Sequence, residues 1–168
     1  AVDLMRFGYL SVQRDYRDLP LAFECWITAF LSNPRSWRDD DCWNGTLSEY
    51  YRDSETYNWH FCKPYVVQII EAWGSSCAEL CLKALCCMTG FGIGPDMFQA
   101  FVLFKLTVLK SKDCEENRRD LGTWSGKDCA LRNLARLEQF LTEEEITRGC
   151  SQAELLSHLT AGIHSESS

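Results

Sequence analysis

Hydrophobic segments alternate along the chain with polar residues of the kinds that begin and end helices. A Ser, Thr or Asp followed three residues later by Glu or Gln forms a capping box, which marks a helix start. Such pairs occur at Thr46/Glu49, Ser76/Glu79, Asp96/Gln99, Thr142/Glu145 and Ser151/Glu154. Helix stops are predicted where Gly or Pro ends a plausible last turn, at Asn33-Pro34, Lys63-Pro64, Gly90, Gly149 and Gly162.

Between these signals the sequence predicts helices near residues 4–16, 21–32, 47–61, 65–73, 77–88, 97–110, 129–141, 143–148 and 152–161. Segment 101–109 is also compatible with a strand, because alternate residues from Val102 to Val108 would line one face. The preceding Asp96 cap and the length of the segment favour a helix.

The 168 residues, 46% of them hydrophobic, are enough for one core, and no internal repeat or linker divides them. We therefore expect an all-α fold: a single-domain, disulfide-rich helical bundle with irregular loops over residues 1–161. A flexible C-terminal tail is expected over 162–168. No run of about 20 uninterrupted apolar residues is present, so the sequence predicts no membrane-spanning helix.

The cysteine content points to an oxidising compartment, because cytosolic chains seldom carry so many thiols without an obvious metal or catalytic arrangement. The ten cysteines are Cys25, Cys42, Cys62, Cys77, Cys81, Cys86, Cys87, Cys114, Cys129 and Cys150. An N-glycosylation sequon at Asn44-Gly45-Thr46 agrees with secretion. Since the chain starts with Ala1, we expect a mature secreted protein or an extracellular ectodomain, with membrane association only through a removed anchor.

Four of these cysteines fall within the helix predicted over 77–88, in the segment CAELCLKALCC. At about 100° per residue, Cys77 and Cys81 share one side, whereas Cys86 lies roughly opposite Cys77. The sulfurs therefore do not converge on one metal ion, and the sequence contains no redox Cys-x-x-Cys motif. We expect disulfide bonds to different neighbours, each contributing roughly 2–4 kcal/mol. A bond between Cys114 and Cys129 would close the polar loop between them and is expected, whereas the other pairings are left open.

The formal net charge of −7 argues against nucleic acid as a partner, because binding phosphates requires a dense basic surface. Basic residues gather between Lys105 and Arg136, but acidic residues interrupt them at Asp113, Glu115, Glu116, Asp120 and Asp128. We interpret this stretch as a solvated face of mixed charge.

The sequence contains no convincing catalytic constellation. His60 is the only histidine within the aromatic part of the chain, and no Gly-x-Ser-x-Gly motif accompanies it. The glycines of FGIGP, which follow Gly90, lack the alternating carboxylates that a calcium loop needs. We therefore expect no enzyme activity, no cofactor and no metal site.

Aromatic residues crowd the segment 35–59, next to the sequon and an acidic triplet. Trp, Tyr and Arg dominate the energetically important positions of protein interfaces. We expect this segment to recognise another extracellular protein, with the chain acting as a ligand, receptor or co-receptor module. The predicted contact residues are Trp37, Arg38, Trp43, Tyr51 and Tyr57.

An alternative interpretation is a carrier that holds a lipid or another apolar small molecule in a helical pocket. The segments from 65 to 110 supply enough apolar residues either to line such a pocket or to fill a core. The candidate lining residues are Ile69, Ile70, Phe91, Phe98, Phe101 and Phe104.

If the aromatic segment makes the interface, replacing Trp43 or Tyr51 by Ala should weaken partner binding by about 1–3 kcal/mol. The melting temperature should stay nearly unchanged, because an interface ring does not support the core. Binding titrations and thermal unfolding of each variant provide the measurement. A large drop in melting temperature would instead identify these rings as core residues.

Overall fold

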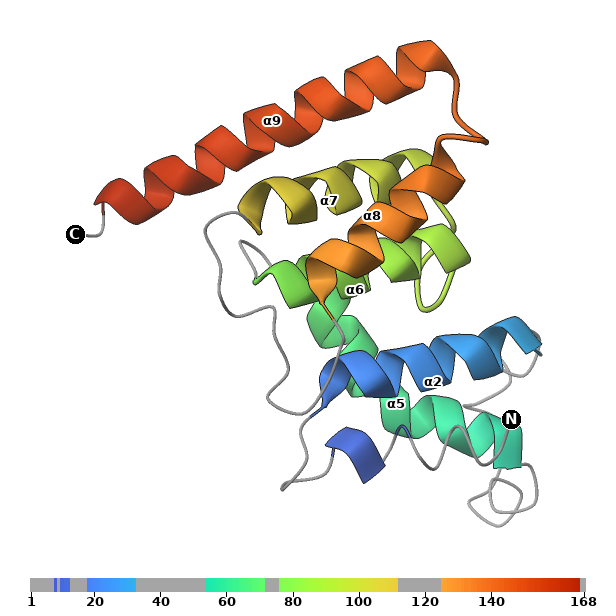
Figure 1. Ribbon diagram of the computed structural model, residues 1–168. Helices are drawn as coiled ribbons and strands as arrows, with labels where there is room; N and C mark the ends of the chain where they lie inside the picture. Colours follow the sequence, from blue (N-terminus) through green and yellow to red (C-terminus); the bar gives the residue numbers. More distant parts are fainter. Residues whose placement is uncertain are drawn as a thin grey trace. The chain divides into compact units, whose positions relative to one another are not determined.

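The computed structural model describes residues 8, 10–12, 18–32, 54–71, 76–111 and 125–166, and the side chains of these residues except over 54–61 and 160–166. Every regular element in this part of the chain is a helix, which confirms the all-α prediction (Figure 1). The helices are α2 (Leu19–Ser32), α5 (Ser54–Glu71), α6 (Cys77–Thr89), α7 (Met97–Lys110), α8 (Gly126–Leu137) and α9 (Glu143–Glu166).

The segment with the ambiguous alternation is helical throughout, as part of α7. The chain divides into two compact units, Ala1–Gln68 and Ile69–Ser168, which we call the first and second units. The division falls within α5, near the end of that helix.

Three of the predicted capping boxes begin helices in the structure. The Ser76 hydroxyl accepts a hydrogen bond from the Glu79 backbone N–H at 3.3 Å, and the Asp96 carboxylate accepts one from Gln99 N–H at 3.0 Å. At the start of α9 the exchange is reciprocal. The backbone N–H of Thr142 donates to the Glu145 carboxylate at 2.8 Å, and that of Glu145 donates to the Thr142 hydroxyl at 3.2 Å.

The helix stop predicted at Lys63-Pro64 is wrong. Helix α5 continues through Pro64, although proline lacks the N–H that a helix interior uses. Cys62, Val66 and Ile69 are all buried at i, i+4 and i+7, so one continuous face crosses the proline. Burial of this face on both sides of the ring stabilises a single helix despite the lost hydrogen bond.

Helix α9 likewise continues through Gly149 to Glu166, so the predicted helices 143–148 and 152–161 are one element. The stop predicted at Gly162 is also wrong, because this residue lies inside the same helix. The pair Ser151/Glu154 is not a cap. Instead, the Ser151 hydroxyl donates back to the Thr147 carbonyl at 3.1 Å, as serine does within a helix.

In the first unit, α2 buries its apolar face around Trp26, whose side chain is almost fully enclosed. The Trp26 ring packs against Phe23 at 5.6 Å and against Tyr65 of α5 at 5.9 Å between ring centroids. Gly8 lies so close to this indole that an added Cβ would fall 2.6 Å from Trp26 Nε1. The ring therefore joins three segments of the unit.

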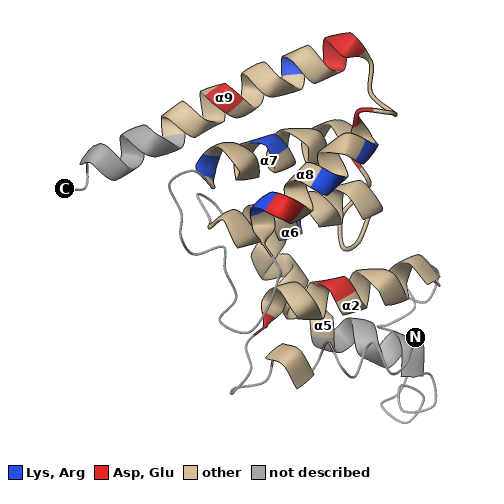
Figure 2. Cartoon of the chain, viewed as in Figure 1, with Lys and Arg blue, Asp and Glu red and all other residues tan. Residues whose placement is uncertain are grey.

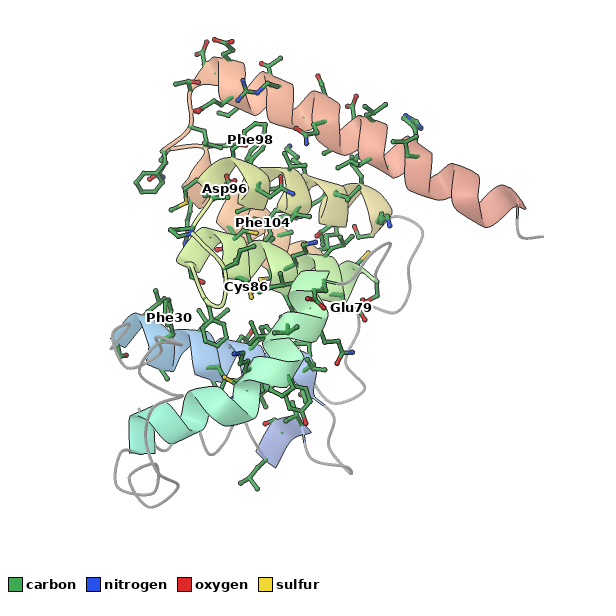
Figure 3. The ribbon with its side chains drawn as sticks, turned by 180° about the vertical axis from the view of Figure 1, so that it is seen from behind. Phe30, Glu79, Cys86, Asp96, Phe98 and Phe104 are labelled. Carbon is green, nitrogen blue, oxygen red and sulfur yellow. The ribbon has the colours of Figure 1, made fainter. Side chains whose placement is uncertain are left out.

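In the second unit, α7 is the central element and packs against α6, α8 and α9 (Figure 1). Its residues from Ala100 to Phe104 are buried in an unbroken run, so burial on all sides, and not a strand face, accounts for the apolar residues of this segment. Phe104 points into the space between the helices in Figure 3. A helix that is buried all round needs neighbours on every side.

The connection from α6 to α7 is a tight turn around a buried ring. Gly90 (φ 82°) caps α6 in the left-handed conformation, and Gly92 (φ 77°) repeats that conformation two residues later. Phe91 between them is fully buried, and the Asp96 N–H returns to the Cys87 carbonyl at 2.8 Å. The loop that leads into α7 is thus fixed at both ends.

Helix α9 approaches α7 at a glycine. A Cβ built on Gly149 would fall 2.7 Å from Phe101 Cδ1, closer than carbon atoms can pack. Phe101 is fully buried, so its ring has no room to move away. The next position on the same side of α9, Ala153, is also small and buried. Small residues therefore set the distance between the two helices.

Replacing Gly149 by Ala should lower the free energy of unfolding by about 1–3 kcal/mol, because overpacking against Phe101 outweighs the better helix propensity of Ala. Urea unfolding measures the change. Gly94→Ala is the matched control, since nothing lies within 4 Å of a Cβ at that position. Equal or higher stability of Gly149→Ala would contradict the close contact.

Candidate functional site

The predicted recognition segment lies mainly outside the described residues. Trp37, Arg38, Trp43, Asn44 and Tyr51 belong to that part of the chain, as do the cysteines at positions 42 and 114. Residues 57 and 60, a tyrosine and a histidine, are in α5, but their side chains are outside the description. The predictions at these positions therefore remain predictions.

The four cysteines of α6 are buried on several sides of the helix, as the sequence predicted. Leucine and alanine side chains are buried between them, and only Glu79 and Lys83 form a partly exposed polar strip. Among the described cysteines, no two sulfurs lie at disulfide-bonding distance. Helix α6 is thus a largely buried element, and Cys86 on it is fully buried.

Burial controls the chemistry of these thiols. It raises the pKa of Cys86 from 9.0 to about 12, and the adjacent Cys87 acts in the same direction. The pKa of Cys87 is raised by burial and by Asp96, against an opposing effect of Lys83. Because the thiolate is the nucleophile, thiols with raised pKa values are poor catalysts at neutral pH.

Within the described residues, no group of three or more His, Cys, Asp or Glu side chains is arranged to hold a metal ion. His158 is exposed on α9.

The residues predicted to line an apolar pocket belong to α5, the α6–α7 connection and α7. Phe91, Phe101 and Phe104 are fully buried and Ile69 nearly so, whereas Ile70 and Phe98 are partly exposed. Phe98 lies on the side of α7 that faces α9 (Figure 3), with the Arg148 guanidinium carbon 4.7 Å from its ring centroid. Burial of this kind fits a filled core as well as a lined cavity.

The surface candidate is the end of the second unit where α6 and α8 finish and α7 and α9 begin (Figure 1). The contacts of Phe98 with Arg148 and of Phe101 with Gly149 bring the starts of α7 and α9 together. Large apolar side chains are exposed at this end: Phe140 is 74% exposed, Met97 41% and Ile93 38%. Exposed apolar clusters of this kind often mark interaction sites.

Each of these three side chains is presented by a fixed backbone. Phe140 N–H donates to the Leu137 carbonyl at 2.9 Å, in a hydrogen-bonded turn that continues α8, and Leu137 itself is buried. Met97 is the first residue of α7, directly after the Asp96 cap. Ile93 follows the turn at Gly92. Their exposure is therefore a property of well-defined turns and helix ends.

Charge at this end is mainly negative. Five carboxylates belong to it, namely those of Asp96, Glu138, Glu143, Glu144 and Glu145, against the two guanidinium groups of Arg136 and Arg148. Figure 2 marks acidic residues at the start of α9 and basic residues along α7 and α8. We call Ile93, Met97 and Phe140, together with the five carboxylates, the end surface.

Sequence reasoning missed the end surface because its residues come from three separate segments. The triplet Glu143–Glu145 was visible, but a favourable position at a helix N-terminus explained it. The one feature in the sequence that could have indicated this surface is Phe140, an aromatic residue within the polar stretch between two helices. Leu155 and Leu159 on α9 form a second exposed apolar edge, which follows the exposed Glu154.

Neither a protein-family profile, nor a curated protein, nor a solved structure matches the chain. Across the described ranges, no helix combines the length and the apolar character needed to cross a bilayer. The functional conclusion therefore depends on the surface itself.

In the reduced protein, Cys86 should resist alkylation at pH 8 in the native state, because a pKa of about 12 leaves roughly a thousandfold fewer thiolates than a pKa of 9. The half-buried Cys150 should react faster. Because folding raises this pKa, the reduced protein should also lose stability as the pH rises from 9 toward 12.

Iodoacetamide labelling followed by peptide mass spectrometry measures both rates, with urea-unfolded protein as the control for intrinsic reactivity. Equal labelling of Cys86 and Cys150 in protein that keeps its helical circular dichroism would contradict the burial. The same labelling without reductant counts the native thiols.

Proposed function

We propose that the protein acts by non-covalent recognition of another extracellular protein, as a ligand, receptor or co-receptor module. The observation that supports it is the exposure of Phe140, 74% open to solvent although its backbone is held in a hydrogen-bonded turn. Burying such a ring in a partner would contribute about 1.5–3 kcal/mol. Because the backbone at Phe140 is already held in a turn, binding there need not order the main chain.

Met97 and Ile93 extend the apolar contact beyond one ring, and the carboxylates provide a polar rim. An apolar centre within a polar rim is the usual organisation of a protein interface. The aromatic segment 35–59 is proposed as a second contact region, on the sequence observations alone.

The proposal includes an oxidising location, with disulfide bonds and a glycan at Asn44. The ten cysteines and the sequon support this part. Labelling of the native protein without reductant tests it directly. Ten reactive thiols in freshly isolated protein would overturn the secreted location, whereas few or none would support it.

Replacing Phe140 by Ser should weaken partner binding by at least about 2 kcal/mol, as for an interface hot spot, and leave stability within about 0.5 kcal/mol. The assay is affinity measurement against a displayed library of extracellular proteins, first selected with the unmodified chain. Leu159→Ser is the matched control, because Leu159 is 58% exposed but lies outside the end surface.

Unchanged affinity of Phe140→Ser would remove the end surface as the site. A loss shared equally by Leu159→Ser would mean that general surface hydrophobicity, rather than this surface, drives binding.

A further inference from the structure

We propose that the end surface binds a cationic amphipathic segment of the partner, with apolar residues on one face and Lys or Arg beside them. This inference rests on the proposed function and names the partner's chemistry. It is carried by the combination of exposed apolar side chains with a surplus of carboxylates at one end of the second unit.

The helix dipoles do not offset this surplus. Two helix N-termini, of α7 and α9, and two C-termini, of α6 and α8, meet at the same end (Figure 1). N-termini carry partial positive charge and C-termini partial negative charge of similar size, so the four contributions largely cancel. The side chains therefore decide the sign of the potential.

Most of these carboxylates remain available to a partner. Glu138, Glu143 and Glu144 are exposed, whereas the carboxylates of Asp96 and Glu145 each take part in a helix cap, with Gln99 and with Thr142. Arg136 and Arg148 offset part of this negative charge, and the Arg148 guanidinium lies over the Phe98 ring. A partner that buries Phe140 also contacts the carboxylates around it. Because opposite charges attract across an interface, these carboxylates favour basic residues in the partner.

The same charges disfavour two other occupants. Anionic lipid surfaces attract basic rather than acidic segments, so the rim opposes membrane binding. A second copy that met this end with its own end surface would place like charges together. Self-association of another kind is compatible with these charges. The acidic end surface of one copy could bind the basic residues of α7 and α8 in a second copy. That arrangement is a separate outcome of the test.

The test is selection of displayed random peptides on the intact protein at low salt. Enriched peptides should combine Leu, Ile or Phe at helical or alternating spacing with flanking Lys or Arg. The affinity of a synthetic enriched peptide should fall about tenfold or more in Phe140→Ser. It should fall roughly threefold to tenfold in the double variant Glu143→Gln/Glu144→Gln, an effect that high salt abolishes.

Glu154→Gln is the matched control, because Glu154 is an exposed carboxylate farther along α9 and outside the end surface. Its affinity for the peptide should stay within about twofold of the unmodified protein. An equal loss in this control would attribute the effect to net charge and would overturn the inference.

Three further outcomes overturn the inference. Peptides that lack basic residues but lose binding in Phe140→Ser would retain the proposed site and refute the partner chemistry. Absence of any enrichment would refute both. The last outcome is unchanged peptide binding in Phe140→Ser together with the loss of another interaction. That interaction would be binding to phosphatidylcholine/phosphatidylserine vesicles, or concentration-dependent self-association measured by sedimentation.

Discussion

The second unit depends on the close approach of α9 to α7 at Gly149 and Phe101. A fully buried aromatic ring lies where any side chain on the opposing helix would collide, so only glycine allows the helices to pack at this distance. The contact holds Arg148 over Phe98 and aligns the starts of both helices. Through this alignment, the short connection that carries Phe140 reaches the same end as Met97.

The surface that results combines exposed large apolar side chains with carboxylates. Exposed large apolar groups lower solubility, and carboxylates around them restore it while limiting which partners can approach. Hydrogen bonds fix the backbone below each apolar side chain, at the turn after α8, at the Asp96 cap and at Gly90. The backbone that carries these side chains is therefore arranged in the free protein, which would reduce the entropic cost of an association at this end.

Helix α6 makes a different contribution. In the sequence alone, its four cysteines suggest a reactive site. Burial, however, raises the pKa values of Cys86 and Cys87 and favours the protonated thiols. The helix supports the second unit by filling space beside α7, and its tight exit around Phe91 sets where Ile93 and Met97 emerge. The buried core of the second unit and the proposed recognition surface are thus neighbouring parts of one segment.

The sequence by itself determined the helical class and the helix starts at Ser76, Asp96 and Thr142. Those caps depend on hydrogen bonds that span three residues, so local identity is sufficient. Only the tertiary structure decided that Pro64 and Gly149 lie inside helices, because burial of distant residues outweighs the local preference to stop. The end surface was equally invisible in the sequence, since its exposure depends on how three separate segments meet.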